Sequence, residues 1–315
     1  MTIQDFIIEG KRRFEAELRD LGIENYVITS EERVKDNDVR LYGLNICEEE
    51  SDCGATVYFD DLYHRCLEGD DWEDLMDEFV YRCMYTASFP RPPVSTSVDE
   101  LELDSIKDKL SVKLFDTVQN KSYLAGKPYI DVGCGLALIA IINAEPSIDS
   151  EWGITVTLDL LDSIGCDKGT LLTEALENTM RIAPPVLARL QDIHEECRPW
   201  ESTDDLLRKY NLLAEDAVRE IRENDSYVLT NEQGWLGASA LFYPGVMQTL
   251  YDILGDYYVI PSSRHELIII ANKDMDVRGM QRVLAQGNMI IVSMEDLLSY
   301  NIFRYDPDIE ALKIA

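Results

Sequence analysis

The sequence predicts an α+β protein with a small N-terminal module followed by a larger mixed α/β domain. A helical pattern, three short strand patterns and a second helical pattern succeed one another in the first 88 residues. A proline-rich stretch then interrupts the periodicity, and a β-β-α-β-β pattern occupies residues 227–271. Since 315 residues can form one large or two ordinary domains, this order of elements favours two.

The N-terminal module, residues 1–88, reads as α-β-β-β-α. Its first helix, Ile3–Leu21, carries apolar residues on one face: Ile7, Phe14, Leu18 and Leu21. Runs rich in β-branched and aromatic residues predict three strands, Asn25–Thr29, Val39–Ile46 and Ala55–Phe59. The closing helix, Asp71–Met84, places Trp72, Leu75, Phe79 and Cys83 on one stripe.

Residues 89–98 are predicted to link the module to the rest of the chain. Pro90, Pro92 and Pro93 cannot continue a helix, and a Ser/Thr stretch follows them. We therefore expect a protease-sensitive boundary at this point.

The larger domain, residues 99–315, begins with strand patterns and continues with a mostly helical segment, residues 168–224. The predicted strands are Leu110–Phe115, Tyr129–Asn143 and Gly153–Leu158. The predicted helices are Leu158–Ile164, Lys168–Ile182, Pro185–Cys197 and Asp204–Asn224.

The clearest local pattern is the β-β-α-β-β unit of residues 227–271. Its predicted strands are Tyr227–Thr230, Trp235–Tyr243, Tyr257–Ile260 and Glu266–Ala271. Pro244 suits the first turn of a helix, and Gly255 supplies its C-terminal stop. A helix at Val277–Ala285, a strand at Met289–Ser293, and a final helix and strand within Met294–Tyr305 complete the prediction.

Charge is the outlying feature of the composition. The chain has 60 Asp and Glu against 29 Lys and Arg, a formal net charge of −31. Direct binding to nucleic acid needs a basic face, and Lys11-Arg12-Arg13 is the main basic cluster. The balance therefore excludes a direct nucleic-acid binder and favours attraction to a basic protein.

Cysteine usage and hydropathy predict a cytoplasmic protein that does not cross a membrane. Seven cysteines without a C-x-x-C pair are typical of reduced thiols, and the N-terminus reads as an amphipathic helix instead of a signal peptide. The longest apolar run, Val132–Ile142, is too short to span a bilayer.

Several segments together resemble an uncharacterised family of gut Gram-positive bacteria, a domain of unknown function often met on mobile elements. They are LYGLNICEEES, ATVYFDDLY, the ALENT helix of residues 175–179, the YPGV helix start of residues 243–246 and the PSSRHE turn of residues 261–266. The resemblance covers most of the chain. It implies a fold and a mobile-element context, and no mechanism.

A glycine-rich segment, Tyr129–Ala137, resembles the first motif of S-adenosylmethionine methyltransferases, in which a strand ends in a glycine turn that approaches the cofactor. Asp131 to Gly135 would form that turn. However, Ala137 replaces the third glycine, and the residues after it read as strand instead of helix. We favour a buried strand with a glycine bulge, and expect no cofactor.

A hydroxyl, an imidazole and a carboxylate cluster at Ser262, Ser263, His265 and Glu266, as a hydrolase would require. No G-x-S-x-G elbow accompanies them, and serines on a tight turn commonly cap backbone groups. We therefore expect a structural turn here. An enzyme of unknown type, a methyltransferase or a hydrolase, remains the alternative to a binding protein.

The spacings of His and Cys residues give little indication of a metal site. His64-x-Cys66 and His194-x-x-Cys197 match no usual zinc pattern, and no Ca²⁺ loop signature is present. No metal site is predicted.

An acidic belt, which we define as residues 48–78, holds 13 Asp and Glu and one Arg. We interpret it as a polyanion-like surface for a basic partner, such as a nucleic-acid-processing enzyme. The alternative is that these acids cap helices and keep an accessory protein soluble. The belt residues assigned to partner binding are Glu48, Glu49, Glu50, Asp60, Asp61, Asp70, Asp71, Glu73, Asp74, Asp77 and Glu78.

Overall fold

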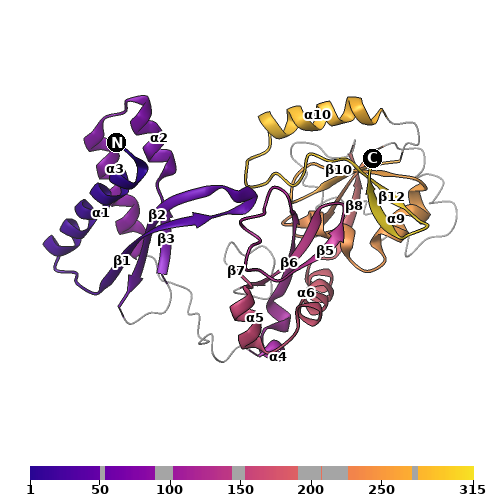
Figure 1. Ribbon diagram of the computed structural model, residues 1–315, viewed down its shortest axis with the longest axis horizontal. Coiled ribbons are helices and arrows are strands. Elements are labelled where there is room, and N and C mark those ends of the chain that lie inside the picture. Colours follow the sequence, from indigo (N-terminus) through magenta and orange to yellow (C-terminus); the bar gives the residue numbers. More distant parts are fainter. Residues whose placement is uncertain (50–53, 89–101, 144–152, 191–206, 208–225, 272–275) are drawn as a thin grey trace. The chain divides into compact units, whose positions relative to one another are not determined.

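A computed structural model describes residues 1–49, 54–88, 102–143, 153–190, 207, 226–271 and 276–315. The chain divides into two compact units, Met1–Ser95 and Thr96–Ala315, which we call unit 1 and unit 2. Helices and antiparallel sheets occur in both (Figure 1), so the α+β class is confirmed. The linker predicted at residues 89–98 lies outside the described residues.

Unit 1 is a three-stranded antiparallel sheet, in the order β1-β2-β3, with its helices packed on the sheet (Figure 1). Its elements are α1 (Ile3–Asp20), β1 (Tyr26–Val34), the 3₁₀ turn η1 (Asp36–Asp38), β2 (Arg40–Glu48), β3 (Gly54–Tyr58), α2 (Asp60–Glu68) and α3 (Trp72–Ser88). Leu44 and Ile46, two residues apart on β2, lie on the same face of the sheet and pack against the apolar stripes of α1 and α3. Phe79 of α3 stacks on Phe59 with ring centroids 3.6 Å apart, so the predicted stripe does form the core.

The predicted α-β-β-β-α order missed helix α2, which lies between β3 and α3. Helix α2 starts at Asp60, directly after β3, and its acidic first turn suits the positive end of a helix dipole. Its buried Leu62 joins the same core. Leu21, expected on the apolar face of the first helix, instead follows the end of α1 and is exposed.

The described residues of unit 2 form two antiparallel sheets. One has the order β4-β6-β5, with β7 paired to β6, and the other has the order β13-β12-β10-β11-β9-β8. The elements up to residue 190 are α4 (Leu103–Ile106), η3 (Lys107–Lys109), β4 (Leu110–Asp116), β5 (Tyr129–Gly133), β6 (Leu136–Asn143), β7 (Gly153–Thr155), α5 (Leu158–Ile164), α6 (Lys168–Ile182) and β8 (Pro185–Arg189). From residue 226 on, the elements are β9 (Ser226–Asn231), η6 (Gly237–Phe242), α9 (Val246–Leu254), β10 (Tyr258–Pro261), β11 (Leu267–Ile270), α10 (Val277–Ile290), β12 (Phe303–Asp306) and β13 (Ala311–Ile314).

One hydrophobic cluster joins both sheets of unit 2. It includes Leu114 and Leu138 from the smaller sheet, Leu229 and Val259 from the larger one, and Leu171 from α6. A second, smaller cluster lies under α10, around Leu284.

Two strand predictions in unit 2 are wrong. Residues Trp235–Tyr243 contain the 3₁₀ helix η6 (Gly237–Phe242) instead of a strand, because β9 already pairs with β8 on one side and β11 on the other. The unit at residues 227–271 is therefore β-η-α-β-β, and Gly245, not Pro244, precedes its helix as the N-cap. Met289–Ser293 is not a strand either, since α10 continues through Ile290.

The helix predicted at Pro185–Cys197 is also wrong over its described part, and so the segment 168–224 is not uniformly helical. Pro185–Arg189 forms the edge strand β8, where a proline, which has no N–H to donate, is tolerated. Residues 191–197 and almost all of Asp204–Asn224 lie outside the described residues. Of the final segment, only the strand is found, as β12, and the sequence did not predict β13.

Candidate functional site

Most of the described acids of the acidic belt lie on or beside helices α2 and α3 of unit 1, and the first group of these carboxylates binds backbone N–H groups. Asp71 Oδ1 accepts hydrogen bonds from the N–H groups of Glu73, at 2.9 Å, and Asp74, at 3.2 Å. Asp60 Oδ2 accepts from the N–H of Tyr42 at 2.9 Å, and burial raises the pKa of this carboxyl group. These two acids therefore serve local structure, as the capping alternative predicted.

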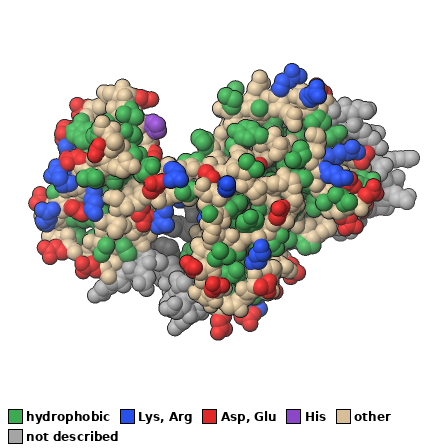
Figure 2. Space-filling view, viewed as in Figure 1, with side chains coloured by type: hydrophobic (Ala, Val, Ile, Leu, Met, Phe, Trp, Pro, Cys, Tyr) green, Lys and Arg blue, Asp and Glu red, His purple; other side chains and the backbone are tan. Residues whose placement is uncertain are grey.

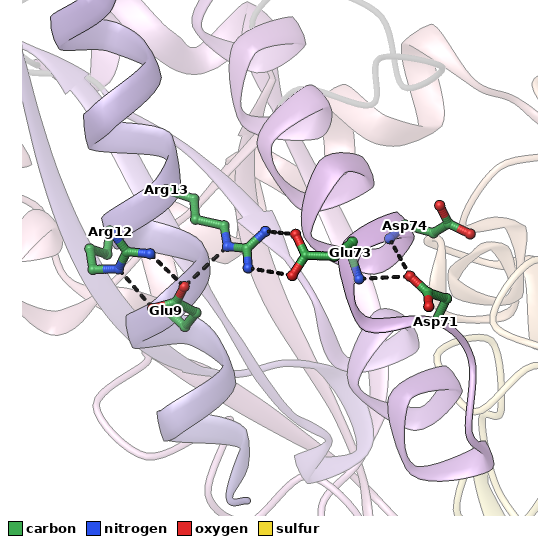
Figure 3. A network of polar contacts seen from close by, with 6 residues as sticks. All are labelled: Glu9, Arg12, Arg13, Asp71, Glu73 and Asp74. Atoms are coloured by element: carbon green, nitrogen blue, oxygen red, sulfur yellow. Dashed lines mark hydrogen bonds and ion pairs between the residues drawn. The ribbon is translucent and has the colours of Figure 1, made fainter.

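A second group pairs with arginines of neighbouring helices. Figure 3 shows Arg13 reaching from α1 to Glu73 on α3, where its two terminal guanidinium nitrogens donate to the carboxylate oxygens at 2.7 and 3.0 Å. On α1 itself, Glu9 binds Arg12 and Arg13, and these two hydrogen-bonded cations lower the pKa of Glu9 to about 2. The network connects α1 to α3 across their packed faces.

The opposite flank of α3 is tied to α2 in the same way. Arg65 on α2 contacts Glu78 at 2.7 Å and Asp70 at 2.8 Å. Arg82 on α3 contacts Asp61 at 2.7 Å and Glu78 at 2.6 Å. Hydrogen bonds from Arg65 and Arg82 lower the pKa of Glu78.

The third group of carboxylates faces solvent. With about 100° per residue, Glu73 and Glu78 fall on opposite flanks of α3, and Asp74 and Asp77 lie between them on the outward crest. Asp74 and Asp77 are exposed and form no ion pair with any residue that the structure describes. Glu48 and Glu49, at the end of β2, are exposed as well, whereas Glu50 is outside the described residues.

The belt is thus divided in three. Glu73 and Glu78 do not project with Asp74 and Asp77 as one uniform row, because they are held against arginines of α1, α2 and α3. The sequence could not show this division, since Arg13 lies 60 residues before Glu73. The crest carboxylates Asp74 and Asp77 are what α3 offers to a partner.

The glycine-rich segment is a β-hairpin. β5 and β6 pair antiparallel with a register shift between Asp131 and Gly133, as the predicted glycine bulge would produce. The prediction of one buried strand is wrong, because the segment forms two strands joined by a turn and β5 is largely exposed. Gly133, Cys134 and Gly135 all have positive φ at the turn, and Asp131 Oδ1 accepts from the N–H of Gly133 at 2.8 Å. β6 follows directly, where a methyltransferase motif would continue into a helix.

The turn at Ser262–Glu266 joins β10 to β11, and its serines stabilise it locally. Ser263 Oγ accepts from the N–H of His265 at 3.0 Å, and Ser262 Oγ donates to Glu266 Oε1 at 3.3 Å. Burial raises the pKa of Glu266. The predicted capping of backbone groups is confirmed for Ser263, whereas Ser262 contacts the Glu266 side chain instead.

His265 has both ring nitrogens engaged within the fold. The N–H of Leu236, a residue with φ of 53°, donates to Nδ1 at 3.1 Å, and Nε2 lies 3.0 Å from Asp296 Oδ1. Since Nδ1 accepts, the proton of the neutral ring resides on Nε2 and is donated to Asp296. Neither nitrogen is left to take a proton from Ser262 or Ser263.

The surroundings of His265 complete a polar junction between three segments. Arg264 Nε lies 2.9 Å from the same Asp296 oxygen, and the Trp235 ring lies 4.5 Å from the imidazole, centroid to centroid. Gly237 must be glycine, because a Cβ there would be 2.1 Å from Thr230 Oγ1 and 2.5 Å from the carbonyl oxygen of His265. Sequence reasoning missed Trp235 and Asp296, which lie 30 and 31 residues from His265 with no shared motif.

Burial opposes charge on His265 and lowers its pKa, although the hydrogen bond to Asp296 acts in the other direction. Burial likewise pushes the pKa of Asp296 upward, but hydrogen bonds from Ser293 and His265 and the charge of Arg264 outweigh it and leave the pKa lowered. Both shifts favour a neutral His265 imidazole beside an ionised Asp296 carboxylate.

No metal centre emerges in the described part of the chain, which contains no group of three His, Cys, Asp or Glu side chains arranged to hold an ion. His64 and Cys66 lie two apart on α2 and therefore point to different sides of the helix. His194 and Cys197 are outside the described residues. None of the described helices combines the length and apolar character needed to cross a bilayer.

Comparison with known proteins gives a family without a described activity. No curated protein and no solved structure matches the chain. Residues 3–307 match the family of unknown function DUF5688. The match extends over α1, the acidic belt, the glycine hairpin and the His265 junction alike, and the chain belongs to this family.

Proposed function

We propose that the protein acts by binding, and that the acidic surface of unit 1 is presented to a basic, nucleic-acid-processing partner. In the mobile-element setting that the resemblance implied, such a protein would be an inhibitor or decoy of an immune nuclease, of the anti-CRISPR or anti-restriction type. The observation that carries the proposal is the outward crest of α3, where Asp74 and Asp77 are exposed and held by no ion pair with a described residue.

The structural ion pairs support this function indirectly. Arg13, Arg65 and Arg82 are bound by the flanking carboxylates and fix α3 between α1 and α2. The crest charges are therefore held on a rigid support, so that a partner need not order them on binding. Side chains three and four residues apart on a helix have Cβ atoms about 5–6 Å from each other, so Asp74 and Asp77 present two closely spaced negative charges, as a polyanion does.

The test combines capture with a functional readout. The full chain is immobilised, bacterial host lysate is passed over it at low and at high salt, and each captured nuclease is purified. Its DNA cleavage is then measured with and without the chain. We expect inhibition that competes with DNA and weakens at high salt, because exposed charges are screened within about 8–10 Å at physiological ionic strength.

Two matched variants locate the site. Asp74→Asn with Asp77→Asn removes two crest charges three residues apart. Asp159→Asn with Asp162→Asn removes two exposed charges at the same spacing from α5 of unit 2. The crest variant should slow association about tenfold, whereas the α5 variant should not.

Equal weakening by both pairs would show that net charge alone acts, as in the accessory-protein alternative. Unchanged inhibition by the crest variant would place the function elsewhere. Glu73 and Glu78 are left intact, since their loss would disturb the inter-helix ion pairs as well as the surface charge.

A further inference from the structure

Helix α10 has one anchored face and one apolar, solvent-facing side. Val277, Met280 and Leu284 pack into the small cluster with β10 and β11, and Asn288 Nδ2 donates to the carbonyl oxygen of Ser299 at 3.2 Å. These positions recur every three or four residues and define the buried side of the helix. The opposite side carries Arg278, Arg282, Val283, Gln286, Met289 and Ile290.

The C-terminal half of that outer side is strongly apolar. Met289 and Ile290 are 82% and 81% exposed, and Val283 is exposed too. Ile291 and Met294, which follow the end of the helix, are exposed as well. In Figure 1, α10 lies at the outer edge of unit 2, and Figure 2 shows Lys and Arg side chains toward one end of this edge and hydrophobic ones toward the other. Single exposed apolar residues are ordinary, but a contiguous group of this kind marks an interaction surface.

The outer side of α10 is complementary to itself. If two copies of the helix lie antiparallel with Gln286 at the two-fold axis, residues equally far from Gln286 face each other. Val283 of one copy then meets Met289 of the other, and the methylene stem of Arg282 covers Ile290. Each such contact occurs twice, as an isologous interface requires.

Charge selects the antiparallel arrangement. Arg278 lies in the first turn of α10, and the exposed Glu295 lies five residues beyond the end of this helix at Ile290. The antiparallel pairing brings these opposite charges to the same end of the interface, whereas a parallel pairing would place Arg278 against Arg278.

We propose that α10 is the interface of a homodimer, formed by antiparallel packing of its outer side against the same side of a second copy. Contacts confined to one helix face are small, below about 1,200 Å² in total, so the dimer is reversible and depends on concentration. This surface belongs to unit 2 and is independent of the proposed partner site on α3.

The test is sedimentation velocity of the full chain across the micromolar range. A monomer–dimer equilibrium is expected, retained at high salt because the contact is largely apolar. Ile290→Glu should weaken dimerisation about a hundredfold, since it buries a carboxylate in an apolar contact. Val118→Glu, at an equally exposed position (82%) in the same unit, is the matched control and should leave dimerisation unchanged.

A charge exchange tests the orientation. Arg278→Glu and Glu295→Arg should each weaken the dimer several-fold, and the double variant should recover it. Circular dichroism and thermal unfolding of each variant should match the wild type, because exposed substitutions usually change stability by less than about 0.5 kcal/mol. Asp74→Asn with Asp77→Asn should leave the dimer intact, which separates this proposal from the partner proposal.

A chain that stays monomeric throughout, or a dimer indifferent to Ile290→Glu, would overturn the proposal. So would a monomer that co-sediments with phosphatidylglycerol vesicles and loses this binding in Ile290→Glu, because α10 would then be a lipid contact. Failure of the double charge exchange to recover the dimer would refute the antiparallel register.

Discussion

His265 illustrates how one side chain can look catalytic in sequence and be structural in the fold. Its neighbours Ser262, Ser263 and Glu266 supply the chemistry of a hydrolase within five residues. In the fold, however, its nitrogens bind the N–H of Leu236 and the carboxylate of Asp296, and its ring packs on Trp235. The imidazole thereby fixes the start of η6 against the β10–β11 turn.

Replacing His265 should show which of these contacts matters. His265→Ala leaves the N–H of Leu236 without its acceptor, a loss of about 1–3 kcal/mol in the free energy of unfolding. His265→Asn places a side-chain oxygen near the former Nδ1 and should be about 1 kcal/mol less destabilising than alanine. Urea unfolding followed by tryptophan fluorescence, with Trp235 as the local reporter, measures both. Equal losses would mean that the ring contact dominates.

The same junction should make stability depend on pH in two opposing ways. The pKa of His265 is lowered by burial, so the unfolded chain binds the proton more readily, and stability falls as pH drops through the ordinary value of 6.5. The pKa of Glu266 is raised by burial, so its contribution is complete below 4.5 and is lost as pH rises through the higher folded-state value. His265→Asn should abolish the loss of stability below pH 6.5 and keep the loss of stability above pH 4.5 that comes from Glu266. Thermal unfolding measured at a series of pH values between 4.5 and 6.5 would reveal this. A variant with the wild-type profile would contradict the assignment.

At the scale of elements, helix α6 shows how a short polar motif serves the sheet. β4 lies at the edge of its sheet, where unpaired backbone groups invite unwanted pairing. Thr179 Oγ1 accepts from the N–H of Val112 at 3.0 Å, and Asn178 Nδ2 donates to the carbonyl oxygen of Leu110 at 2.8 Å. The Asn-Thr end of the ALENT segment thus gives this edge its hydrogen bonds.

Thr179→Val keeps the shape of the side chain and removes the acceptor. Because the N–H of Val112 is buried, we expect a loss of about 1–3 kcal/mol in the stability of unit 2. Thr173→Val makes the same change at an exposed position of α6 and should stay within about 0.5 kcal/mol of the wild type. Guanidinium unfolding of the two variants side by side provides the measurement. Indistinguishable midpoints would mean that water replaces the threonine at no cost.

The elements that could be predicted from sequence are those in which apolar residues recur at the spacing of a single buried helix face or strand. The stripes of α1, α3 and α9 and the runs of β9, β10 and β11 are of this kind. Trp235–Tyr243 has a strand-like composition, but it cannot pair with β9, because β8 and β11 occupy both edges of that strand. Likewise, the belt acids could be counted, whereas their division depends on arginines from other helices, which no local pattern reveals.

At the scale of the whole molecule, each unit has a hydrophobic core of its own. The core of unit 1 is centred on Phe6, Phe59 and Phe79, whereas that of unit 2 joins its two sheets. The three helices of unit 1 are in addition tied together by the ion pairs of Arg13, Arg65 and Arg82. A unit with its own core and its own polar contacts should be stable by itself.

We therefore predict that a broad-specificity protease cuts the chain first within Pro90–Pro93, and that residues 1–88 expressed alone give a cooperative thermal transition. Phe79→Ala in the full chain should then cost about 3–5 kcal/mol in unit 1 alone, because the ring is fully buried against Phe59. Calorimetry should show one transition lowered and the other unmoved. Were cleavage confined to residues 198–225, or were both transitions to fall together, the two units would share one folding equilibrium, and a crest variant on α3 could no longer be assumed to leave unit 2 undisturbed.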